Sequence, residues 1–178
     1  MSIYIKIIIV LFGCGIAYLL KESPLADISV SKEGDYNEDC VSEGCFAYKC
    51  FEKTAHCGPN GYLLAYGTKY CQRFHEPDVY DRFDEDGKAF INSTASCLIN
   101  KMEQYIQKHS EKLIDCNDLT AEAFRSHVDC YLQCDFCHVC KTNKAALFHA
   151  YDLTDFFDKL ALEQVWSIIS KCGIFNCF

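Results

Sequence analysis

The sequence lacks long apolar runs, basic clusters, strand-like alternation and the common catalytic motifs. Its main apolar segment covers about a dozen residues, whereas a membrane-spanning helix needs roughly 20. The net charge is −8 and the Lys and Arg residues are scattered, which argues against nucleic acid and anionic membranes as partners. No Gly-x-Ser-x-Gly, His-Glu-x-x-His or phosphate-binding glycine loop is present. We therefore expect a protein that is not an enzyme and holds no cofactor or metal.

The N-terminus is typical of a secretion signal. Lys6 precedes an apolar run over residues 7–17, and Gly15 and Ala17 place small residues at positions −3 and −1 of a signal-peptidase site. We predict a signal peptide over residues 1–17, with cleavage there or at a later position up to about residue 26. An uncleaved signal anchor that extends through residues 18–20 is the alternative. Cleavage would make the protein secreted and extracellular, without a membrane attachment.

Cysteine is the residue that this sequence has in excess. There are 14 Cys, and all but Cys14 lie outside the predicted signal. Disulfides persist in exported proteins because the compartment is oxidising. The odd number that remains predicts a disulfide framework plus one thiol that is free or bonded to another molecule, and the second case suggests a covalent homodimer.

The rest of the chain divides into a lead and one domain. Residues 18–39 are polar and acidic, contain Pro24 and Gly34, and show no periodicity, so we expect a flexible lead. Residues 40–178 have the length of a single domain. The 13 Phe and 11 Tyr of the chain are enough to build an apolar core that disulfides would reinforce.

Helical periodicity predicts the secondary structure. We expect a short helix over residues 62–74 and a long helix that starts after residues 84–86 and ends near residue 108. Asp118 and Thr120 are the candidates for the N-cap of the next helix.

A last helix is expected to open at Asp152 or Thr154 and to end at Cys172, with Gly173 as a left-handed C-cap. The fold class predicted from these elements is all-α: a disulfide-rich bundle of four or five helices.

The segment from Cys130 to Cys140 holds four Cys and one His, and it is open to several interpretations. Zinc binding would need reduced thiols, and its cysteines lack the usual two separated C-x-x-C pairs. Cys134-x-x-Cys137-His138 matches a c-type haem attachment signal, but nothing else in the chain indicates haem. A thioredoxin-like redox site is disfavoured because no βαβ pattern surrounds it. We favour a structural interpretation in which Cys130, Cys134 and Cys137 share one helical face and staple it to neighbours.

Two further motifs concern the polar surface. The acidic residues 78–87 suggest a calcium loop, but the register puts Arg82 at the first position and Ser93 at the twelfth, where carboxylates are needed. We therefore expect a solvated helix start. The single Asn-x-Ser/Thr sequon begins at Asn92, on the polar side of the long helix, and makes Asn92 a candidate glycosylation site.

The cysteine pattern resembles that of the stanniocalcin family of secreted glycoprotein hormones. The resemblance is carried by GCFAYKC at residues 44–50, by DGKAFI at 86–91 and by SCLIN at 96–100. The order and the spacing of ten cysteines agree as well, including separations of 14, 7 and 35 residues between Cys116, Cys130, Cys137 and Cys172. The chain is thus identified as a divergent or invertebrate-like member, with a stanniocalcin-like helical domain over residues 40–178.

The resemblance implies five intrachain disulfides. These pairs are Cys40 with Cys50, Cys45 with Cys71, Cys57 with Cys116, Cys97 with Cys130, and Cys137 with Cys172. Three cysteines are left over. We predict a local bridge between Cys134 and Cys140, and we assign to Cys177 the interchain role that an eleventh cysteine on a C-terminal extension has in the family.

The resemblance also implies a function. It indicates a disulfide-linked homodimer, a hormone-like signalling or inhibitory glycoprotein in calcium and phosphate homeostasis that acts by binding without catalysis. Its partner would be an extracellular receptor or a secreted metalloprotease of the pregnancy-associated plasma protein A type. The alternatives are a cysteine-rich secreted binding or effector protein of unrelated activity, or a Cys/His metal or redox protein.

Overall fold

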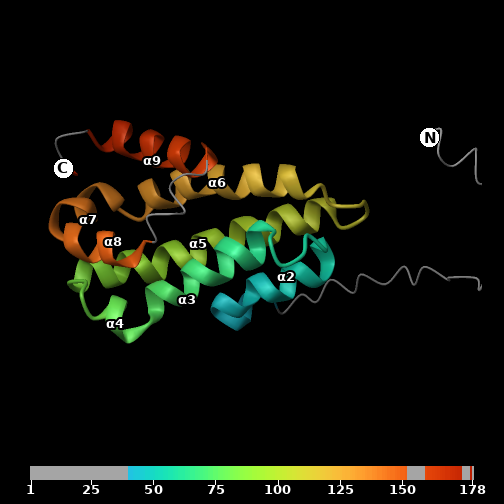
Figure 1. The fold of residues 1–178 in the computed structure, drawn as a ribbon, viewed down its shortest axis with the longest axis horizontal. Coiled ribbons are helices and arrows are strands. Elements are labelled where there is room, and N and C mark those ends of the chain that lie inside the picture. Colours follow the sequence, from blue (N-terminus) through green and yellow to red (C-terminus); the bar gives the residue numbers. More distant parts are fainter. Residues whose placement is uncertain (1–39, 152–158, 174–176, 178) are drawn as a thin grey trace, which may run out of the picture. The chain divides into compact units, whose positions relative to one another are not determined.

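The computed structural model describes residues 40–151, 159–173 and 177 (Figure 1). The predicted signal peptide and acidic lead lie outside these residues. In the described part of the chain every regular element is helical, which confirms the all-α, disulfide-rich class. The elements are the 3₁₀ helix η1 (Cys40–Phe46), α2 (Ala47–Ala55), the π-helix η2 (Leu63–Thr68), α3 (Lys69–His75), α4 (Pro77–Tyr80), α5 (Glu85–His109), α6 (Cys116–Gln133), α7 (Phe136–Thr142), α8 (Lys144–Ala150) and α9 (Lys159–Cys172).

The long helix α5 forms where the sequence predicts it. Asp84 is its N-cap and accepts a hydrogen bond from the Gly87 N–H at 2.8 Å. Acidic residues occupy its first turn, while Lys108 and His109 occupy the last, so both ends complement the helix dipole. Asn143 locks this start into the fold: its side-chain oxygen accepts from the Asp84 N–H at 2.9 Å, and its amide nitrogen donates to the Asp84 carboxylate at 2.8 Å.

The start of α6 differs from the prediction. Its N-cap is Asp115, whose carboxylate accepts from the N–H groups of Asn117 and Asp118 at 2.8 and 3.2 Å. Thr120, one of the predicted caps, already lies inside the helix and donates to the Cys116 carbonyl. Asp115 caps the helix because its extended backbone places the carboxylate over the first free N–H groups.

The end of α6 overturns another expectation. Cys134 is the C-cap of this helix, and Asp135 adopts a left-handed backbone with φ 63°. The chain then turns into the short helices α7 and α8, which the periodicity did not predict because seven residues show hardly two helical turns. Cys130 and Cys137 therefore lie on different helices, and the single face predicted for them with Cys134 does not exist.

Helix α6 lies between α5 and α9 in the described domain (Figure 1). The predicted start of the last helix at Asp152 or Thr154 lies outside the described residues, and α9 is described from Lys159. It ends at Cys172, and Gly173 has a φ of 85°, so the predicted left-handed C-cap is confirmed.

The buried apolar residues form two clusters. We call the first core cluster the one built by η1, α2, η2, the later part of α5 and the early part of α6, with Phe51, Leu63 and Ile106 at its centre. The second core cluster is built by α3, α4, the early part of α5, the end of α6, and α7 to α9; it includes Phe74, Val79 and Val139.

Candidate functional site

The structure contains all five disulfides that the resemblance implied. These are Cys40–Cys50, Cys45–Cys71, Cys57–Cys116, Cys97–Cys130 and Cys137–Cys172, with Cα–Cα distances of 5.6, 5.5, 5.6, 5.8 and 5.1 Å. Cys97–Cys130 ties α5 to α6, and Cys137–Cys172 ties α7 to α9. The helices of the domain are thus held together by covalent bonds between neighbouring elements.

The pairing of the other three cysteines was predicted wrongly. Cys140 is bonded to Cys177 instead of Cys134, with a Cα–Cα distance of 5.0 Å. Cys134 is the free cysteine among the described residues. The reason is the left-handed turn at Asp135. After this turn α7 places Cys140 in the second core cluster, which also contains Cys177. Cys134 precedes the turn and is half-buried at the end of α6.

This pairing removes the metal and haem interpretations of the segment from Cys130 to Cys140. Zinc and haem attachment both need reduced thiols. Three of the four cysteines are in disulfides, and Cys137, which the haem signal requires, is bonded to Cys172. The same bridges leave Cys134 without a partner thiol for a C-x-x-C redox site.

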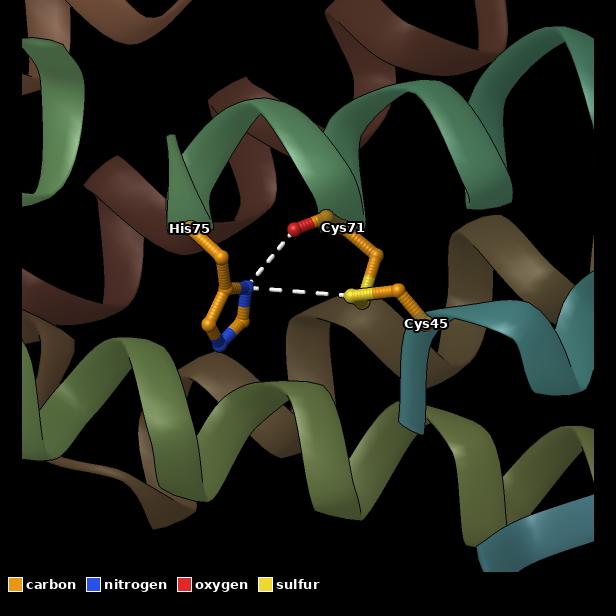
Figure 2. A group of neighbouring side chains, drawn as sticks. All are labelled: Cys45, Cys71 and His75. Carbon is orange, nitrogen blue, oxygen red and sulfur yellow. Dashed lines mark hydrogen bonds between the residues drawn. A yellow bond between two sulfur atoms is a disulfide. The ribbon is translucent and has the colours of Figure 1, made fainter. Parts of the chain in front are cut away.

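One group of metal-ligating residue types does come together, at Cys45, Cys71 and His75. Figure 2 shows the His75 ring beside the Cys45–Cys71 disulfide, with its Nδ1 3.7 Å from the Cys45 sulfur. The Nδ1–H donates to the Cys71 carbonyl at 2.7 Å, and the ring stacks on Tyr80. Disulfide sulfurs cannot act as thiolate ligands, so this group is a packed corner of the framework.

The acidic residues 78–87 have separate partners and do not converge on one point. Asp78 pairs with Arg73 at 3.0 Å, and hydrogen bonding to this guanidinium lowers the pKa of the Asp78 carboxyl. Hydrogen bonds from the Asn143 side chain and then from the Gly87 N–H lower the pKa of Asp84. Asp86 lies 3.2 Å from His138. The geometry agrees with a solvated helix start and gives no calcium loop.

The candidate glycosylation site Asn92 is exposed on α5. Its side-chain nitrogen, to which a glycan would be attached, donates a hydrogen bond to the Tyr80 hydroxyl at 3.0 Å. A glycan would replace this surface contact without entering the core. Glycosylation of Asn92 stays a prediction.

The main apolar concave feature in the described part of the chain is a cavity of about 390 Å³. Its walls come from α2, η2, α3 and α5 to α9, and most of its lining residues are aromatic or aliphatic. It reaches the surface near α8, where the lining residues Lys144 and Phe148 are half-buried and exposed. A volume of this order lies within the usual range for small-molecule sites, about 300–1,000 Å³.

Apart from Lys144 at the mouth, the polar groups described in the cavity wall are few and are neutral at pH 7. His127 donates from Nδ1–H to the Ala123 carbonyl at 2.7 Å, which leaves Nε2 to accept from the Tyr62 hydroxyl at 3.4 Å. Burial lowers the pKa of His127 to about 4, so the imidazole is neutral at pH 7. The hydroxyls of Tyr131 and Tyr151 lie 2.6 Å apart, and burial raises the pKa of Tyr131 to about 12.

The π-helix η2 forms one wall of this cavity. The Thr68 hydroxyl donates to the Leu63 carbonyl at 2.9 Å, across the wide turn. A Cβ at Gly67 would lie 2.6 Å from the Tyr48 ring, so only glycine allows this close approach. Sequence reasoning missed the cavity, although one signal was available: Thr94 is a polar residue in the apolar stripe that Phe90, Leu98 and Met102 form at helical spacing on α5.

The disulfide pairs and the spacing of the cysteines indicate one family, and the comparison with known families agrees. A model of the Stanniocalcin family matches residues 36–176. The chain belongs to the stanniocalcin family. Membership indicates a secreted, hormone-like glycoprotein, and the stanniocalcin family is known for hormone-like activity. No curated protein and no solved structure matches the chain significantly. In the part of this stanniocalcin-like chain that the structure describes, no helix has both the length and the apolar character needed to cross a membrane.

Proposed function

We propose that this protein is a secreted, hormone-like signal that regulates calcium and phosphate handling by binding a protein partner, without catalysing a reaction. The observation that carries the proposal is the family match over residues 36–176, and the five bridges that the resemblance implied support it. The partner is an extracellular receptor or a secreted metalloprotease of the pregnancy-associated plasma protein A type. Both partners would be recognised through the folded surface.

The signalling role is tested with protein purified from a secretory host. Applied to a transporting epithelium, the oxidised protein should change the transepithelial flux of calcium or phosphate. Reduced and alkylated protein is the matched control, because it has the same sequence without the framework. Equal fluxes with both preparations would contradict the proposal. A parallel assay with the metalloprotease, in which its cleavage rate is measured with and without the protein, distinguishes an inhibitor from a receptor ligand.

We also propose that the active form is a homodimer linked through Cys134. Twelve cysteines form intrachain bridges, and Cys134 is the free one among the described residues. It lies in a surface hollow with Ser93, Asp135 and His138, where a second chain can reach it. The interchain role assigned to Cys177 thereby passes to Cys134.

Gel electrophoresis without reductant tests the link. Wild type should migrate as a dimer, and Cys134→Ser should migrate as a monomer. Cys177→Ser is the matched control: it should keep the Cys134 link while it frees Cys140. A covalent dimer that persists in Cys134→Ser and disappears in Cys177→Ser would show that the interchain bond is at Cys177 after all.

A further inference from the structure

In the described lining of the cavity between α3, α5, α6, α8 and α9, one buried side-chain atom has no hydrogen-bond partner. Thr94 is 6% exposed, lines the cavity, and its hydroxyl has no hydrogen-bond partner. Hydroxyls on helices usually donate to the carbonyl four residues earlier. Ser96 and Thr120 do so here, at 3.1 and 2.7 Å, but Thr94 does not. A buried hydroxyl without a partner is destabilising, so this group is available for a ligand.

The rest of the wall determines the chemistry of that ligand. The lining is mainly aromatic and aliphatic, and it offers few groups that could hold ordered water. The imidazole of His127 is neutral because burial lowers its pKa to about 4, and burial raises the pKa of Tyr62 and Tyr131. Among the described residues of the lining the permanent cation is Lys144, which is half-buried near the exposed Phe148 at the mouth. A charged group would therefore be disfavoured inside, and a single hydroxyl or carbonyl would be accepted.

We propose that this cavity binds a small neutral lipid: an apolar body of fatty-alcohol, isoprenoid-alcohol or sterol type with one hydroxyl or carbonyl group that hydrogen-bonds to Thr94. The apolar body fills the space between the helices and the polar group supplies the missing partner of the Thr94 hydroxyl. Binding is independent of the dimer link at Cys134, which lies in a separate surface hollow. This site is additional to the protein-binding role.

Three matched probes test the proposal on the full-length, oxidised protein by isothermal titration calorimetry at neutral pH. The probes are 1-dodecanol, tridecane, which has the same number of heavy atoms without the hydroxyl, and dodecanoate. We expect saturable binding of one dodecanol per chain. Tridecane should bind about tenfold more weakly because it leaves the Thr94 hydroxyl unpaired.

Variants separate the ligand site from nonspecific apolar binding. Thr94→Val has nearly the same shape, and it should reduce the dodecanol affinity to that of tridecane. Ser96→Ala removes an exposed hydroxyl on the same helix and should change nothing. Ala95→Trp should fill the cavity and abolish binding of both probes, with the helical circular dichroism retained.

Specific outcomes would overturn the proposal. Equal affinities of wild type and Thr94→Val for dodecanol would show that the hydroxyl is not used. Absence of saturable binding of dodecanol would exclude the site. Dodecanoate binding that is tighter than dodecanol binding and is lost in Lys144→Gln would replace the neutral lipid by a fatty acid with its carboxylate at the mouth.

Discussion

The two core clusters are held together in different ways. The first contains Phe51, Leu63 and Ile106 at 1% exposure or less, and the bridges Cys40–Cys50, Cys45–Cys71 and Cys57–Cys116 surround it. The second forms the larger part of the cavity wall, through residues such as Phe74 and Leu147. Its C-terminal part depends on Cys137–Cys172 and Cys140–Cys177. Three bridges thus surround the first cluster, whereas the second has two at its C-terminal part and packs around most of the cavity.

Removal of a disulfide bridge is expected to have the largest effect on the stability of the two clusters. Cys57–Cys116 closes a loop of 59 residues and Cys140–Cys177 one of 37. Because loop entropy grows only with the logarithm of length, removing either pair with alanines should lower the free energy of unfolding by about 4 kcal/mol. Urea unfolding of the two double variants measures this. A cost for Cys140→Ala/Cys177→Ala that is smaller by more than about 2 kcal/mol would show that the second cluster opens separately.

The next effect is the pH dependence caused by His127, which lies on the cavity wall. Its pKa falls from 6.5 to about 4 on folding, because burial disfavours the charged ring. Between these pH values the unfolded chain binds a proton that the folded protein does not, so stability is lost as the pH falls. The expected loss is about 3 kcal/mol.

Urea unfolding at intervals from pH 7 to pH 4 tests this, with His127→Gln as the control that should remove most of the slope. Asp78 and Asp84 have lowered pKa values, so they lose their contribution only below their ordinary pKa of 3.8 and do not interfere in this window. If the unfolding free energy of His127→Gln falls equally steeply with pH, other titratable groups cause the pH dependence.

A smaller effect is expected at Gly87, where the second cluster is tightly packed. A Cβ there would lie 2.7 Å from the Phe83 ring and 2.9 Å from the Asn143 side-chain oxygen. Gly87→Ala gains about 1 kcal/mol of helix propensity but must displace the Asn143 amide that locks Asp84. The net loss of unfolding free energy should be about 1–2 kcal/mol. Ser93 is exposed on the same helix, so the unfolding free energy of Ser93→Ala should stay within ~0.5 kcal/mol of wild type. Equal stability of the two variants would show that Phe83 and Asn143 move aside for the added Cβ without a measurable loss.

The same two regions differ in how far the sequence predicts them. Around the first cluster the pairings Cys40–Cys50, Cys45–Cys71 and Cys57–Cys116 follow from the family pattern, which ten cysteines define. Every incorrect cysteine assignment falls in the second region, at Cys134, Cys140 and Cys177, where the chain departs from that pattern. Helices α7 and α8 are too short for periodicity to reveal them.

The cavity could not be predicted from the sequence, and the reason is physical. The apolar stripe of α5 predicts that Thr94 faces the core, but a stripe cannot show whether the facing helices fill the space. The left-handed turn at Asp135 decides where Cys140 lies, and φ above zero at a residue other than glycine is rare and is not encoded by a recognisable motif. Cavities and bridge partners depend on such tertiary details.

The smallest expected effect concerns the outer face of α9, beside the second cluster. Trp166 is the single Trp of the chain and is 64% exposed, and Leu162, one turn earlier, is 51% exposed. Trp166→Ala should therefore change the free energy of unfolding by no more than ~0.5 kcal/mol. In the folded monomer of Cys134→Ser the Trp emission should be that of a solvated indole and should be quenched readily by acrylamide. If the wild-type dimer shows a blue-shifted, protected Trp, the second copy covers α9, because only burial can remove the indole from water; identical emission in both would leave this face free for the protein partner.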